Sequence, residues 1–202
     1  LDIYFIQNPE IQLAFVDRAT FRKRMQLAFA ALEEEVAAGR VGCYGIATWE
    51  GLRRAPVSPD YLSLEIMLRL AAEVAGPDHH LRAIQLPVNP TMPEVQTLRN
   101  QPVRNSVLTV LDAARDLGVT VIASAVLGQG ALSDRHAAVL ADTFPRLDGL
   151  APRALQFARS LPQVTAALFG SLNPVHLRQT LTVSAVAPDP ERALRAAQIL
   201  AR

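Results

Sequence analysis

The sequence predicts an α/β fold of the (β/α)8 TIM-type barrel, incomplete here and comprising about the last five strand–helix units. Five short apolar runs alternate with amphipathic helical stretches, as in a parallel sheet covered by helices. Half of the 202 residues are hydrophobic, and the mean hydropathy of +0.17 is typical of strands buried on both faces. A complete barrel takes about 250 residues. We therefore expect a single domain over residues 1–202, with the earlier strands in the same or another chain.

An open, doubly wound sheet is the alternative architecture. Such sheets usually carry a G-x-G-x-x-G turn directly after a strand. No predicted strand is followed by this pattern, and Gly128-Gln129-Gly130 lacks the third glycine. The barrel is therefore preferred.

The first units are defined by apolar runs that end at turn residues. A strand over residues 1–6 is closed by Asn8-Pro9, and Gly39 ends a helix expected over 21–38. The apolar positions of that helix recur at spacings of three and four, namely Met25, Phe29, Leu32 and Val36. The elements expected next are a strand over 41–47, a loop over 48–51, a helix over 61–75 and a strand over 81–88.

The later units follow the same alternation less regularly. Residues 91–104 are polar and predict a loop, and a helix is expected over 106–117 with Gly118 as its end. A strand over 119–126 precedes a stretch without pattern that extends to Gly149. The last elements expected are a helix over 151–160, a strand over 164–169, and helices over 174–181 and 188–201.

Composition excludes several classes of function. The net charge is +1 with both signs interspersed, which does not favour a nucleic-acid partner. Cys43 is the one cysteine, so no internal disulfide forms and a reducing, cytoplasmic location is expected. No apolar stretch approaches the ~20 residues of a membrane span. His79-His80 lack metal-ligand spacing and predict a solvated turn, so no metal site is expected.

In a barrel of this type, functional groups collect at the carboxyl ends of the strands. The residues there are mostly amides, hydroxyls and glycines, without the acid, base or nucleophile that a hydrolase needs. They suit a ligand held by hydrogen bonds. Gly170-Ser171 before a helix is a candidate phosphate site, although the same pair is also an ordinary helix start.

Several segments at these strand ends resemble the aldo/keto reductases. They are LDIYFIQNPE (1–10), ALEEEVAAGRVGCYGIATW (31–49), AIQLPVN (83–89), AARDLGVTVIASAVLGQGAL (113–132) and ALQFARSLPQVTAALFGSLNPVHLRQTL (154–181). They occur in the family's order and cover most of the chain. The resemblance implies a (β/α)8 barrel that uses NADPH to reduce a carbonyl substrate.

The resemblance also assigns residues. The family's catalytic Asp, Tyr and Lys belong to its first three strands, and its catalytic His corresponds to Gln7. Gln7 can donate a hydrogen bond but does not titrate near neutrality as His does. The cofactor positions correspond to Thr48, Gln85, Ser124, Leu127, Gly128, Gly170, Ser171, His176, Gln179 and Thr180. Gln85 matches the family's ligand to the nicotinamide carboxamide.

Two functions follow from these matches. The first is an NADP-dependent oxidoreductase of the aldo/keto reductase type, not expected to be active as this chain alone. The alternative is a catalytically inactive member that serves as a binding or interaction module. Gln7, Ser124 and Thr180 depart from the family pattern and favour the module, whereas Gln85, Gly128 and Gly170 favour a retained nucleotide site.

Overall fold

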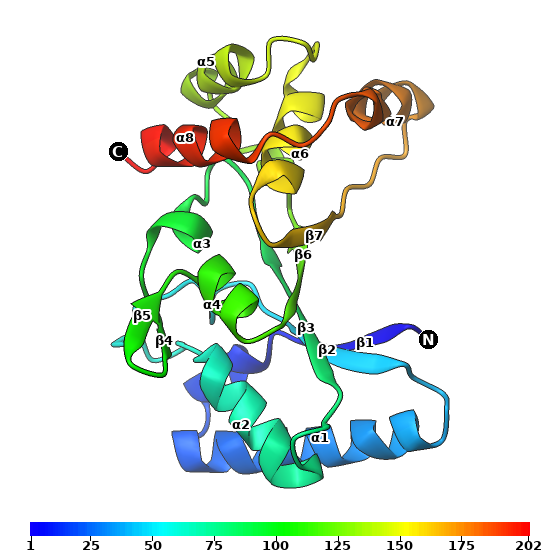
Figure 1. Ribbon diagram of the computed structural model, residues 1–202, viewed down its shortest axis with the longest axis vertical. Helices are drawn as coiled ribbons and strands as arrows, with labels where there is room; N and C mark the ends of the chain where they lie inside the picture. Colours follow the sequence, from blue (N-terminus) through cyan, green and yellow to red (C-terminus); the bar gives the residue numbers. More distant parts are fainter. The chain divides into compact units, whose positions relative to one another are not determined.

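A computed structural model describes residues 1–202 (Figure 1). The chain forms two compact units. The first unit comprises Leu1–Leu86 with Arg99–Thr120, and the second comprises Pro87–Leu98 with Val121–Arg202.

The first unit is built on three parallel strands in the order β1 (Ile3–Gln7), β2 (Cys43–Ala47) and β3 (Leu81–Pro87). The 3-10 helix η1 (Pro9–Ala14) and helix α1 (Arg18–Ala37) connect β1 to β2, and α2 (Leu64–Ala75) connects β2 to β3. Figure 1 shows α1 and α2 side by side on this unit. The strand–helix alternation predicted for this half of the chain is confirmed.

The amphipathic face of α1 forms much of this unit's core. Phe21, Met25, Phe29 and Leu32 are buried. The ring of Phe29 lies 5.5 Å from that of Tyr44 on β2, measured between centroids. Gly45 is required where it stands, because a Cβ atom there would lie 2.6 Å from the Ala83 carbonyl oxygen on β3.

A β-hairpin follows β3 where the sequence predicted first a polar loop and then a helix from Ser106. Strands β4 (Gln101–Val103) and β5 (Ser106–Leu108) pair antiparallel, and α4 (Val110–Asp116) begins only after Thr109 caps it. Distant backbone groups hold the hairpin. The Gln101 side chain accepts from Leu64 N at 2.9 Å and donates to the Leu62 and Leu52 carbonyls.

The second unit contains the parallel pair β6 (Thr120–Ser124) and β7 (Val164–Ala167). Its other elements are α3 (Glu94–Thr97), η2 (Gly128–Gly130), α5 (Asp134–Thr143), α6 (Leu150–Ser160), α7 (Pro174–Leu181), η3 (Thr182–Ala185) and α8 (Pro190–Leu200). The bounds of α7 agree with those predicted, and α6 and α8 differ by one or two residues. Helices α5, α6 and α8 pack against one another, and Figure 1 draws them in yellow-green, yellow and red.

Helix α5 and short α3 were not predicted from the sequence. Leu140 is the one fully buried side chain of α5, so the helix shows little apolar periodicity. Its start depends on a capping box in which the His136 ring accepts from Ser133 N at 3.1 Å. The usual capping box has Glu or Gln at that position, so His136 gave no recognisable signal.

The prediction of a solvated turn at His79-His80 was wrong. His79 is buried, and burial lowers the pKa of its ring. The His80 ring nitrogen Nδ1 lies 2.7 Å from Glu33 Oε2, and Glu33 Oε1 accepts from Tyr44 Oη and His80 N at 2.8 Å each. The contacts between Glu33 and His80 join α1 to the start of β3.

No helix has the length and apolar character needed to cross a membrane. The structure also contains no group of three or more His, Cys, Asp or Glu side chains placed to hold a metal ion.

The Glu33 cluster predicts a pH dependence of stability. Burial raises the Glu33 pKa, but the hydrogen bonds from His80 and Tyr44 outweigh burial and leave it below the ordinary value. The ionised carboxylate therefore stabilises the fold above the unfolded glutamate pKa of about 4.3. That stabilisation is lost as the pH falls through the lower, folded-state pKa.

We expect the Tm of Glu33→Gln to lie below that of the wild type near neutral pH, with the gap narrowing as the solution is acidified. Glu34→Gln is the matched control, because Glu34 is exposed on the same helix and its side chain has no partner. Thermal melts of all three proteins across the acid range provide the measurement. A gap that stays constant with pH would contradict the role assigned to Glu33.

Candidate functional site

The carboxyl ends of β1, β2 and β3 place three predicted residues on neighbouring strands of the first unit. Gln7 lies opposite Ala47, and Ala47 lies opposite Gln85. Beyond the strands, Asn8 N donates to the Ala47 carbonyl at 2.6 Å, and Thr48 N donates to the Gln85 carbonyl at 2.9 Å. The side chains of exposed Gln7 and half-buried Gln85 make no hydrogen bonds within the chain.

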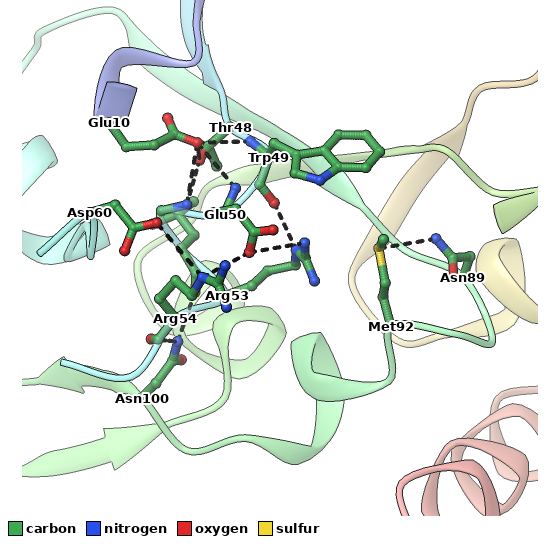
Figure 2. A network of polar contacts seen from close by, with 12 residues as sticks. Glu10, Thr48, Trp49, Glu50, Arg53, Arg54, Asp60, Asn89, Met92 and Asn100 are labelled. Atoms are coloured by element: carbon green, nitrogen blue, oxygen red, sulfur yellow. Dashed lines mark hydrogen bonds and ion pairs between the residues drawn. The ribbon is translucent and has the colours of Figure 1, made fainter. Parts of the chain in front are cut away.

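The Thr48 side chain, in contrast, is committed to the protein itself. Its hydroxyl donates to Glu10 Oε1 at 2.5 Å and accepts from Gly51 N at 2.9 Å (Figure 2). Glu10 Oε1 also accepts from Trp49 N at 2.9 Å and from Glu50 N at 3.1 Å. Thr48 therefore fastens the loop after β2 to buried Glu10, and its hydroxyl is occupied.

Sequence reasoning did not single out Glu10. It lies on η1, three residues beyond the end of β1, and it is 4% exposed. The available signal was its position, because an acidic residue that follows Asn8-Pro9 at a strand end lies near the turns of neighbouring strands.

The Thr48 contacts predict a stability effect. Thr48→Val keeps the shape but leaves Gly51 N–H and Glu10 each with one partner fewer in a buried setting. Such a loss costs about 1–3 kcal/mol, whereas Thr48→Ser retains the hydroxyl and should cost much less. Chemical denaturation of both variants measures the difference, and equal stabilities would refute the structural role of this hydroxyl.

The second unit contains a cavity of about 870 Å³ into which six predicted cofactor residues converge. These are Leu127, Gly170, Ser171, His176, Gln179 and Thr180. They come from the loop after β6, the loop after β7 and helix α7. His176, Gln179 and Thr180 share one face of α7, because Gln179 and Thr180 follow His176 by three and four residues.

The sequence before α7 explains how this wall forms. Asn173 caps the helix by accepting from Val175 N at 2.9 Å, and Pro174 occupies a first-turn position that requires no N–H. Ser171 Oγ accepts from Asn173 N at 3.1 Å, which bends the chain into the helix. Thr180 is buried and its hydroxyl donates to the His176 carbonyl at 2.8 Å, so Thr180 contributes shape more than a free hydroxyl.

Ser124 and Gly128 lie close in sequence to Leu127 but do not line this cavity. Ser124 ends β6, and its carbonyl accepts from Val88 N at 3.0 Å. Gly128 is buried at the start of η2 with a φ of 63°, a left-handed conformation that favours glycine. Both therefore help to hold the loop that carries Leu127.

Two charged residues of the cavity were missed by sequence reasoning. Arg146 and Asp148 line it from the segment between α5 and α6, and neither side chain has a hydrogen-bond or ion-pair partner in the structure. They fall in the stretch where no pattern was found before Gly149, so only the folded chain places them in the same cavity as His176.

The donor set of this cavity suits a nucleotide. Arg146 and His176 can bind a phosphate group, and Asp148 can accept from a ribose hydroxyl. Apolar side chains that can face a planar base are Leu127, Leu147, Leu150, Phe169 and Val186. Gly170 adds no side chain and leaves the backbone before α7 open, with no atom within 4 Å of a Cβ placed there.

Comparison with known proteins agrees with this architecture. No family model matches the sequence, and no curated protein matches it. Among solved structures, the chain is similar to a thermostable aldo-keto reductase, Tm1743, solved with the inhibitor epalrestat, with a TM-score of 0.65 and 16% identity over 98% of this chain and 60% of that one.

Other solved structures give the same result. The aldo-keto reductase AKR11C1 from Bacillus halodurans, in its holo form, has a TM-score of 0.64 and 14% identity over 100% of this chain and 61% of that one. The aldo/keto reductase from Brucella melitensis has a TM-score of 0.63 and 12% identity, covering 98% and 61%.

These comparisons establish the fold. The chain has the strand–helix architecture of part of an aldo-keto reductase (β/α)8 barrel, as the sequence predicted, and it spans about 60% of the length of these structures.

Proposed function

We propose that the protein is an NADPH-linked oxidoreductase of the aldo-keto reductase type, in which the second-unit cavity binds the adenosine-phosphate end of the cofactor. One observation carries the proposal. Residues assigned to the cofactor by resemblance, from three separate segments, line a single cavity that also contains Arg146. The fold supports the same assignment, because the similar structures are aldo-keto reductases.

Five residues of the cavity have roles in this proposal. Arg146 and His176 bind the 2′-phosphate, which is the group that distinguishes NADPH from NADH. The exposed backbone at Gly170 and Ser171, before the positive end of α7, suits a further phosphate. Asp148 accepts a hydrogen bond from a ribose hydroxyl. By resemblance, the position of His176 is one where the family often has an Arg that pairs with the 2′-phosphate, and in this proposal Arg146 supplies that cation from a loop.

At the strand ends of the first unit, the resemblance assigns Gln85 to the nicotinamide carboxamide and Gln7 to the substrate carbonyl. When bound, the nicotinamide supplies a hydride. Gln7 orients the carbonyl by donating a hydrogen bond, but an amide cannot deliver the proton that the product alkoxide requires. The proton donor in this proposal is a residue outside residues 1–202.

A binding module without catalysis is the second candidate, and the Thr48 contacts favour it. A hydroxyl that already serves Glu10 and Gly51 is poorly available to a carboxamide, and Ser124 provides no aromatic face for the nicotinamide. Oxidation of NADPH in the presence of a simple aldehyde separates the two when it is measured on the protein together with the earlier strands that supply the proton donor. Turnover supports the oxidoreductase, and cofactor binding without turnover supports the module.

The cavity assignment predicts how one substitution changes affinity. Adenosine 2′,5′-bisphosphate is the probe, because it carries the 2′-phosphate and no nicotinamide. Arg146→Gln removes a charge-assisted hydrogen bond, so we expect its dissociation constant to rise about tenfold to a hundredfold. AMP, which lacks the 2′-phosphate, should bind both proteins equally. Titration calorimetry measures all four combinations.

Arg178→Gln is the matched control, because Arg178 lies on α7 but does not line the cavity. It removes the same charge and should leave the bisphosphate affinity nearly unchanged. An equal loss in both arginine variants would show that net charge alone attracts the probe. If neither probe binds the wild-type protein, the cavity assignment is wrong.

A further inference from the structure

A second cavity, of about 530 Å³, lies in the first unit between η1 and the loop after β2. Its walls are largely apolar and include Ile11, Leu13, Phe15, Trp49 and Pro59. Phe15 is 81% exposed and Ile11 is 59% exposed. Apolar side chains that remain this accessible beside a cavity favour the binding of an apolar group.

The charged residues that line this cavity are all acidic. They are Glu10, Glu50 and Asp60. Figure 2 shows how the latter two are paired: Arg54 lies 3.0 Å from Glu50 and 3.7 Å from Asp60, and Arg53 lies 3.4 Å from Glu50. Glu10 has no cation within ion-pair distance, although buried Arg53 is near enough to attract it electrostatically. Arg18, the nearby cation on α1, donates to the carbonyls of Ser58, Pro59 and Tyr61.

Only one of the two carboxylate oxygens of Glu10 has hydrogen-bond partners. Oε1 accepts from the Thr48 hydroxyl and from backbone N–H groups of the loop after β2. Oε2 is buried and has no hydrogen-bond partner. A buried carboxylate oxygen that lacks a donor is unfavourable, so a ligand that brings a charged donor to Oε2 gains both a hydrogen bond and an ion pair.

We propose that this cavity binds an organic cation that has an ammonium group on an apolar body. The ammonium donates to Glu10 Oε2 and forms an ion pair with this carboxylate. The apolar body packs against Ile11, Leu13 and Phe15. This site lies within the first unit and does not depend on the nucleotide cavity of the second unit.

Three probes of similar size test the proposal, namely benzylammonium, benzyl alcohol and benzoate. Titration calorimetry on the protein should give saturable binding of benzylammonium. Benzyl alcohol should bind at least about tenfold more weakly, because it lacks the charge, and benzoate should not bind. The fluorescence of Trp49 should change over the same concentration range, and Trp49→Phe should abolish that change.

Two variants locate the charge and the apolar wall. Glu10→Gln should reduce the affinity for benzylammonium to that for benzyl alcohol, while Glu34→Gln, an exposed acid of the same unit, should leave it unchanged. Phe15→Ala alters an exposed side chain and should weaken all binding several-fold, even if Glu10→Gln fails to fold. Equal affinities for benzylammonium and benzyl alcohol in the wild type, or no binding of benzylammonium, would overturn the proposal.

Discussion

Backbone hydrogen bonds that extend beyond the carboxyl ends of parallel strands hold the loops that carry most of the candidate functional residues. In the first unit these bonds join Asn8 to Ala47 and Thr48 to Gln85. In the second unit they join Val88 to Ser124 and Leu168 to Ala123. Because a parallel ladder places all carboxyl ends at one edge, these bonds fix the backbone at the point where each loop begins.

The two units use these fixed points differently. In the second unit, the side chains of Arg146 and Asp148 are left without partners within the chain, and His176 and Gln179 are exposed beside the cavity. In the first unit, the Thr48 hydroxyl serves Glu10. The polar side chains of the second-unit cavity are therefore available to a ligand. In the first unit, the Thr48 hydroxyl near Gln7 and Gln85 instead stabilises the fold.

Sequence patterns predicted the elements that bury a continuous apolar face. The spacing from Met25 to Val36 fixed α1 to within three residues at its start and one at its end, and Pro174 marked the start of α7. The β4–β5 hairpin escaped prediction, because its stability comes from Gln101 contacts with residues nearly forty positions earlier. Helix α5 escaped because it buries one side chain fully and is capped by His136.

The residues of the candidate sites also fall into two groups, those that the sequence predicted and those that it did not. Gly170, Ser171 and the α7 residues were found because they form a contiguous motif that resembles a known family. Arg146 and Glu10 were missed, because each lies in a segment without periodicity or motif. Their importance arises only from the folded chain, which places Arg146 and His176 in the lining of one cavity and leaves Glu10 Oε2 without a donor.

In the proposed function, the second-unit cavity is the site that binds a phosphorylated nucleoside. Hydrogen–deuterium exchange with and without adenosine 2′,5′-bisphosphate tests this directly. We expect slower exchange in two separate segments, the backbone from Gly170 to His176 and the loop from Arg146 to Ala151, with little change in η1 and the loop after β2. Unchanged exchange in both segments at saturating ligand, or protection confined to other parts of the chain, would contradict the account.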